Sequence, residues 1–157
     1  MGPSNATVRQ WLEMFAEAVR TRDYARGRDL FAPEAVGFGT VAERAVGLDR
    51  LVSEKWRRVW GATNGFAFDL DALLVGGDDP VYWAAAPWSS VGRTADGVDA
   101  ERRGRATIVL VRRGEQLLAV HTHFSFVPSG AITPSSAEEL SAIAAGAAAA
   151  AAPGSHR

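Results

Sequence analysis

The chain has 157 residues, of which 47% are hydrophobic and 22% charged, and its 17 basic and 18 acidic residues give a net charge of −1. This length supports one domain with its own core, and the even charge balance disfavours nucleic acid or an anionic membrane as a partner. The chain has no cysteine, which excludes disulfides and thiol chemistry. It also lacks a membrane-spanning apolar run and a secretion signal, so we expect a cytoplasmic protein.

The N-terminal part shows helical periodicity. Residues 7–20 carry apolar side chains three and four positions apart, including Trp11 and Phe15, which is typical of a helix with one buried stripe. Asp23 is a good N-cap for a second, shorter helix, which Pro33 would end. The two predicted helices would form a hairpin.

A short strand and a third helix are predicted next. Residues 35–40 are apolar with glycines, which suits a strand that another backbone or a ligand approaches closely. Residues 48–60 return to helical spacing with Trp56 and Trp60 on the buried stripe, and Gly61 marks the end. Lys55 is the only lysine, and its helical surroundings suggest an ordinary surface position, which leaves little room for Schiff-base chemistry.

The rest of the domain reads as a sheet. Four β-like runs are separated by short turns, and they cover residues 66–75, 81–91, 103–112 and 116–127. Short connections favour antiparallel pairing. We therefore predict an α+β fold, in which N-terminal helices pack on a strongly curved mixed or antiparallel sheet and cover one of its faces. Because both faces carry bulky side chains, we expect a homodimer through the outer sheet face.

The C-terminal segment differs in kind, because residues 147–152 are all alanine. Alanine favours helix but buries little surface, so residues 135–157 are predicted to be a partly helical tail that frays. The domain itself is expected over residues 7–134, after an N-terminal extension of residues 1–6.

Two of the three histidines lie two residues apart in the last run. In a strand, His121, His123 and Ser125 share one face, whereas Phe124 and its alternate neighbours share the other. The Phe124 face is the more apolar and suits contact with the helices. We therefore favour a register in which both histidines point away from the helices, although a shift of one residue would exchange the two faces.

Three roles are open to these histidines. Two imidazoles on one strand can share a metal ion, but the third histidine, His156, lies in the tail and no further ligand has a suitable spacing, so we predict no metal. His121 or His123 can act in general acid-base catalysis if it lies in an apolar cleft. We favour a third role, in which they form hydrogen bonds across the sheet or at a dimer interface.

Other charged residues are weaker candidates. Arg105 offers a fixed cation for an oxyanion and is kept as a catalytic candidate beside the two histidines. Arg102 and Arg103, at the start of the same strand, offer the same kind of cation for a carboxylate, enolate or phosphate, but they are read first as a solvated strand end. Asp69 and Asp71 alternate with apolar residues and are read first as the polar side of a strand.

Two motifs carry a resemblance to a known family. Gly37-Phe38-Gly39-Thr40 follows the second helix, and His121-Thr122-His123-Phe124-Ser125 closes the sheet. In this order, over roughly residues 7–128, the chain resembles the SnoaL-like branch of the nuclear transport factor 2-like superfamily, which has a ketosteroid isomerase-like or cystatin-like cone. The closing strand is also similar to that of the calmodulin-dependent kinase II association domain. The resemblance implies a deep, mostly apolar pocket and dimerisation.

We accordingly expect a pocket that binds a small hydrophobic molecule without a cofactor. The candidate lining residues are Trp11, Phe15, Phe38, Thr40, Trp56, Trp60, Trp83 and Phe124. If the domain is an enzyme, the resemblance implies an acid-base isomerase, cyclase or hydratase. The alternative is a non-catalytic dimerisation or ligand-sensing module, since the fold alone leaves the chemistry open.

Overall fold

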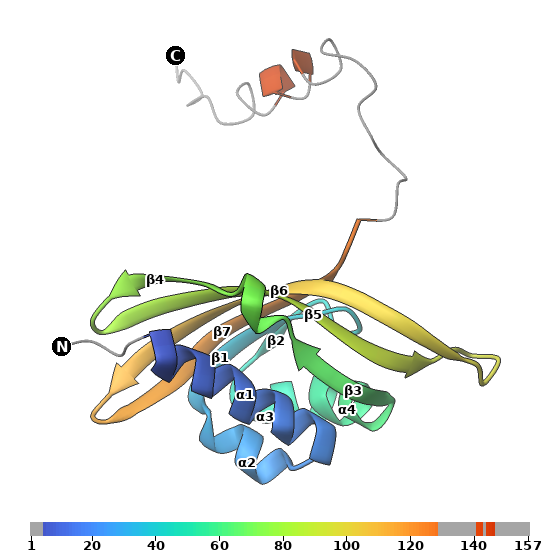
Figure 1. Cartoon of the computed structure of the whole chain (residues 1–157), viewed down its shortest axis with the longest axis horizontal. Coiled ribbons are helices and arrows are strands. Elements are labelled where there is room, and N and C mark those ends of the chain that lie inside the picture. Colours follow the sequence, from blue (N-terminus) through green and yellow to red (C-terminus); the bar gives the residue numbers. More distant parts are fainter. Residues whose placement is uncertain (1–4, 129–140, 143, 147–157) are drawn as a thin grey trace, which may run out of the picture. The chain divides into compact units, whose positions relative to one another are not determined.

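The computed structural model describes residues 5–128, 141, 142 and 144–146 (Figure 1). The chain divides into two compact units, Met1–Val127 and Pro128–Arg157, and the fold and site below belong to the first. The domain boundary expected at residue 134 and the alanine run at 147–152 lie outside the described residues. In the described part, no helix is long and apolar enough to cross a membrane. The cytoplasmic location remains a prediction.

The first two helices form where the sequence predicts them. Helix α1 spans Asn5–Thr21 and α2 spans Tyr24–Asp29, and the side chain of Asp23 caps α2 by accepting a hydrogen bond from the Arg26 backbone N–H at 3.0 Å. The second helix ends earlier than expected, because strand β1 already begins at Phe31 and runs to Phe38. Pro33 lies within β1, where the pairing with β7 is irregular, so its missing N–H breaks no regular ladder.

The third predicted helix is continuous but not regular. It consists of α3 (Leu48–Arg50), a π-helical segment η1 (Leu51–Trp56) and α4 (Arg57–Gly61). Gly61 ends it, as predicted. π-Helical turns within α-helices are uncommon and occur frequently at functional sites. This one contains Lys55 and Trp56.

One mixed sheet forms the other layer, in the order β2-β1-β7-β6-β5-β3, with β4 also paired to β5. The strands after β1 are β2 (Ala45–Val46), β3 (Thr63–Phe68), β4 (Leu74–Asp78), β5 (Val81–Arg93), β6 (Asp99–Arg113) and β7 (Gln116–Phe126). All pairs are antiparallel except β1 with β7. The predicted α+β architecture on a curved mixed sheet is confirmed.

The first predicted run, residues 66–75, was wrong in one respect, because it divides into β3 and β4. A 3-10 turn at Leu70–Ala72 separates them, and the Asp69 carboxylate accepts a hydrogen bond from the Asp71 backbone N–H at 3.2 Å. This local bond competes with strand pairing, so the chain turns where alternation alone predicts continuation.

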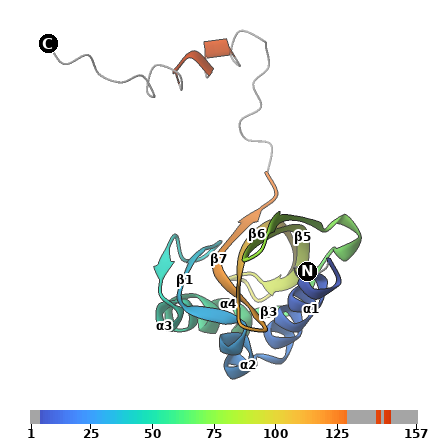
Figure 2. The same cartoon turned by 90° about the vertical axis from the view of Figure 1, so that its left-hand side faces the viewer.

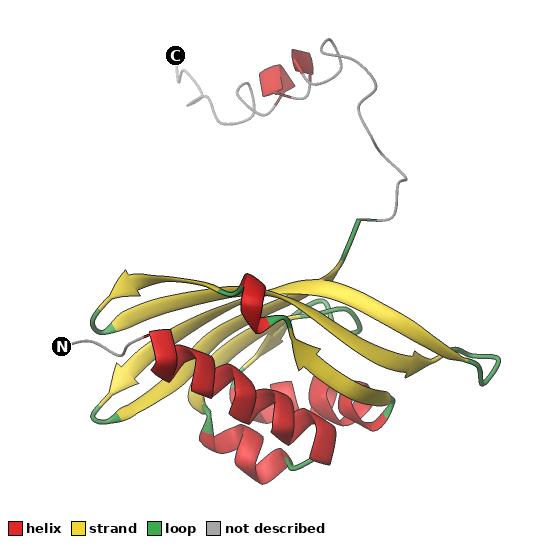
Figure 3. Ribbon diagram, in the orientation of Figure 1, coloured by secondary structure: helices red, strands yellow, loops and turns green. Residues whose placement is uncertain are grey.

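Helices α1 to α4 lie against one side of the sheet, which curves around them (Figures 2 and 3). The core between the two layers is rich in aromatic side chains: Trp11 and Phe15 stack at 5.4 Å, and both rings lie within 6 Å of Phe31. The buried Trp11 Nε1 donates to the Leu30 carbonyl at 3.1 Å, so this large residue is satisfied within the core.

Strand β7 has the predicted register. Thr122 is buried and Phe124 packs against the core, whereas His123 is exposed. A β-bulge at Val120 lets Ala119 and Thr122 both face the core although they lie three residues apart. We call the side of β5, β6 and β7 that points away from the helices the outer face. The two histidines belong to it.

Candidate functional site

A pocket of about 550 Å³, including its open mouth, lies between the helices and the sheet. Its lining comes from α1, η1, α4, the loop after β1, and strands β3, β5, β6 and β7. The lining residues are Phe15, Val19, Thr40, Lys55, Trp56, Val59, Trp60, Thr63, Phe66, Trp88, Ser90, Arg102 and Phe124. Concave sites with mostly apolar walls and a few polar groups commonly bind small organic ligands.

Aromatic rings make most of the wall. Trp56 and Trp60 stack with ring centroids 4.6 Å apart on the helical side. On the sheet side, the Phe124 ring lies 6.2 Å from Phe15 and 6.4 Å from Trp88. Such surfaces favour a flat apolar molecule, since ring faces and edges add specific contacts to the apolar area buried.

Lys55 reaches into this pocket from η1. The residue is only 6% exposed; its Nζ donates to the Phe38 carbonyl at 2.9 Å and lies 5.1 Å from the centre of the Phe124 ring. Burial lowers the pKa of the Lys55 ammonium from 10.5 to about 8. Gly39 makes room for the side chain, since a Cβ at that position would lie 2.3 Å from the Lys55 Cε.

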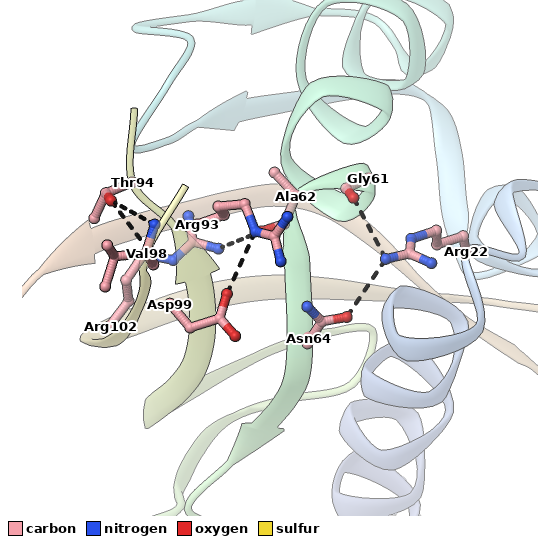
Figure 4. A network of polar contacts seen from close by, with 9 residues as sticks. All are labelled: Arg22, Gly61, Ala62, Asn64, Arg93, Thr94, Val98, Asp99 and Arg102. Carbon is pink, nitrogen blue, oxygen red and sulfur yellow. Dashed lines mark hydrogen bonds and ion pairs between the residues drawn. The ribbon is translucent and has the colours of Figure 1, made fainter. Parts of the chain in front are cut away.

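Arg102 brings a second cation from β6. Its Nη2 donates to the Thr63 hydroxyl at 2.7 Å and to the Ala62 carbonyl at 3.4 Å, the latter drawn in Figure 4. The Arg102 Nε is buried and has no hydrogen-bond partner among the described residues. Gly92 accommodates this guanidinium, because a Cβ there would lie 2.3 Å from the Arg102 Cζ and Nε.

Trp88 adds a third donor. Its Nε1 is also buried without a hydrogen-bond partner in the described part of the chain. The indole packs over Gly104 on the neighbouring strand, where a Cβ would come within 2.4 Å of the ring. No aspartate or glutamate is among the lining residues. The pocket therefore combines apolar walls with cationic and neutral donors and carries no acid of its own.

The two histidines and Arg105 do not line this pocket. His121 Nδ1 lies 2.8 Å from the Val36 carbonyl, and the Phe38 ring packs edge-on against both imidazoles at 5.0 and 5.6 Å. Arg105 is exposed and its Nε donates to the Ser125 hydroxyl at 3.2 Å. The three catalytic candidates thus share the outer face. No cluster of three His, Asp or Glu residues suited to a metal occurs among the described residues.

Five of the eight predicted lining residues line the pocket: Phe15, Thr40, Trp56, Trp60 and Phe124. The other three predicted residues are not among its lining residues. Trp11 is fully enclosed in the core and stacks on Phe15. Phe38 alternates with Gly37 and Gly39, which face Lys55, so its ring points outward and is 36% exposed. Trp83 alternates with the buried Tyr82 and covers Gly76 on the outer face.

Both pocket cations were misread from the sequence. Lys55 was expected at the surface, but it lies four residues after Leu51 and three after Val52, both buried, so its spacing already places it on the buried stripe. Arg102 was expected at a solvated strand end, but it alternates with Gly104 and Ala106, which face the core. In each case the prediction followed the usual surface preference of the residue type, although the spacing in the sequence indicated the buried side.

The sequence matches the SnoaL-like domain family over residues 8–129. No curated protein matches it. Among solved structures, a nuclear transport factor 2-like superfamily protein from Salmonella enterica serovar Typhimurium superposes with a TM-score of 0.71 at 16% identity, over 84% of this chain and 96% of the other. A protein from Xanthomonas campestris, described as a calcium/calmodulin-dependent protein kinase II association domain, gives 0.69 at 19% identity, over 81% and 91%.

A third similar structure, from Streptomyces avermitilis, is described as a dehydratase of the same superfamily; its TM-score is 0.66 at 14% identity, over 78% of this chain and 95% of the other. At such identities the likeness establishes the fold and leaves the activity open. The family match covers most of the described domain and both motifs noted in the sequence. The chain therefore belongs to the SnoaL-like domain family and has the nuclear transport factor 2-like fold.

Proposed function

We propose that the domain binds a small hydrophobic molecule in the pocket between its helices and sheet. The observation that carries this proposal is an apolar, largely aromatic lining that surrounds one buried amine, Lys55. A core built only for stability gains nothing from a buried unpaired cation, since burial disfavours its charged form. A ligand site accounts for both the hollow and the lysine.

Catalysis, if the domain performs it, depends on Lys55. Its pKa of about 8 suits proton transfer near neutral pH, and it lies next to the apolar space that a substrate would fill. The reaction classes this supports are isomerisation, cyclisation and hydration or dehydration of the bound molecule. The relative described as a dehydratase is compatible with the last of these.

Ligand occupancy can be tested with a neutral aromatic probe such as benzamide, by thermal shift and by quenching of tryptophan fluorescence. Val59→Phe adds a ring inside the pocket, whereas Val81→Phe adds the same ring at an exposed position on the outer face of β5. We expect the first variant to lose probe binding and the second to keep it. Equal binding by both variants would place the ligand elsewhere.

A second function, dimerisation without catalysis, is favoured by the outer face. Trp83 and Val81 are 42% and 47% exposed on it, and Phe38 of the neighbouring strand β1, beside His121 and His123, is 36% exposed. We propose that a second copy of the chain covers this apolar surface. Light scattering should then give twice the chain mass, and Trp83→Glu should give the monomer. Val41→Glu, at an exposed loop position, serves as the control.

A further inference from the structure

We propose that the ligand of this pocket carries an oxyanion, as a small flat carboxylate, enolate or phenolate does, and that Lys55 and Arg102 bind it. This rests on the proposed function and narrows it from a hydrophobic molecule to an anionic one. The pocket's unpaired donors, its charge and its geometry each support the proposal.

The donor groups exceed the acceptors available to them. The Lys55 ammonium has three N–H bonds, and one is accepted by the Phe38 carbonyl. The Arg102 Nε and the Trp88 Nε1 have none accepted within the described residues. A buried donor without a partner costs free energy, so native structures rarely keep several in one place without a reason. A ligand whose acceptor oxygens reach these donors, after a small shift of the side chains packed around them, would satisfy them.

The charge balance points the same way. Lys55 and Arg102 are the charged residues of the lining, and neither is among the ion pairs in the described part of the chain. Two cations that share an apolar pocket without a carboxylate create a positive potential there. An anion that enters this pocket gains attraction from both, and its own body keeps water away from them.

The arrangement of the aromatic rings favours an anion with a flat ring. Lys55 Nζ lies 5.1 Å from the centre of the Phe124 ring, and the centre of the Trp88 ring lies 6.4 Å from the same ring, so the ammonium and the indole both neighbour one aromatic surface. Arg102 pairs across the strands with Ser90, which also lines the pocket. A ring that packs against Phe124 would bring a substituent oxygen towards these donors.

Benzoate and benzamide test the inference because they share one shape and differ in charge. At pH 7 and fixed ionic strength, we expect calorimetry to show at least a tenfold tighter binding of benzoate. Lys55→Met and Arg102→Met should each remove most of this preference while benzamide affinity changes little. Arg103→Met is the matched control, since Arg103 is the next residue on β6 but is exposed and paired with Glu101 at 2.9 Å.

The outcomes separate the two proposals. If benzamide binds and benzoate binds no better, the oxyanion inference is wrong and the hydrophobic pocket stands. If neither compound binds, the proposed function fails and the inference fails with it. If Arg103→Met removes the preference as strongly as the two pocket variants, the effect is general surface electrostatics, which also overturns the inference.

A pH series adds a readout specific to Lys55. Benzoate stays ionised throughout, so a fall in its affinity above pH 8 should come from loss of the Lys55 proton. The other nearby titratable groups do not line the pocket: Glu54 is paired with Arg50 on the exposed side of the helix, and His121 faces outward. A decline that persists in Lys55→Met would contradict the assignment.

Discussion

The two faces of strand β7 show how differently this domain uses polar residues. On the outer face, His121 and His123 lie beside the Phe38 ring, and the His121 Nδ1 lies within hydrogen-bonding distance of the Val36 carbonyl. On the inner face, Phe124 forms part of an aromatic wall, and a lysine from another element supplies the charge. The two histidines are outside, and the buried lysine, whose pKa is lowered to about 8, is inside.

The chemistry available to this pocket therefore depends on the burial of a cation and not on the residue type alone. Lys55 would be inert at the surface, where an ammonium stays protonated well above pH 8. Buried against Phe124 and Gly39, it becomes a group that can change its charge. The following substitutions test this contrast, beginning with the largest expected effect.

Replacing Lys55 with methionine should raise the free energy of unfolding by about 3 kcal/mol at pH 7, because each unit of pKa shift corresponds to about 1.4 kcal/mol. The folded-state pKa of about 8 lies below the ordinary 10.5, so the unfolded chain binds more protons between these values. The stability of the unsubstituted protein therefore rises over that window, and the advantage of the variant shrinks. Urea denaturation from pH 7 to 10.5 measures both.

Arg50→Met is the control for this experiment. Arg50 lies on the same continuous helical segment, but its side chain is 70% exposed. We expect it to change stability by less than about 0.5 kcal/mol at every pH. If Lys55→Met gives no gain at pH 7, or a gain that stays constant up to pH 10.5, the lysine does not bear the burial cost described above.

Neighbouring positions on β7 should differ sharply when each is truncated to alanine. Phe124→Ala removes a ring that contacts Phe15 and Trp88, and we expect a loss of about 2 kcal/mol because the residue is half-buried. His123→Ala removes an exposed side chain and should change stability by less than about 0.5 kcal/mol. Equal losses from the two variants, measured by urea denaturation, would contradict the assignment of the two faces.

Much of the fold followed from the sequence because its signals are local. Helical spacing predicted α1 and the segment from Leu48 to Gly61, and the Asp23 cap predicted the start of α2. Period-two alternation predicted the long strands. The faces of β7 were also predicted correctly, because only one of them is apolar enough to meet the helices.

The pocket was predicted less well because its charged residues are buried, which is unusual for their residue types. Lysine and arginine are rarely buried, so the buried spacing of Lys55 and Arg102 was given too little weight. For Trp83 the opposite applies. A tryptophan is expected to be buried, but its cross-strand partner Gly76 leaves a flat surface on the outer face, which the Trp83 ring covers. The contacts that decide these cases join segments far apart in the chain.

The substitution of His121 is expected to have a smaller effect than the substitutions of Lys55 and Phe124. Its Nδ1 lies 2.8 Å from the Val36 carbonyl, a contact between β7 and β1, so His121→Ala should cost about 1 kcal/mol, as the loss of one partly buried hydrogen bond does. Benzoate and benzamide binding should stay unchanged, because no atom of His121 lines the pocket. Urea denaturation and calorimetry on the same variant test both points. Unchanged stability with lost benzoate binding would mean that the ligand site extends to the outer face, and the contrast between the two faces of β7 would no longer hold.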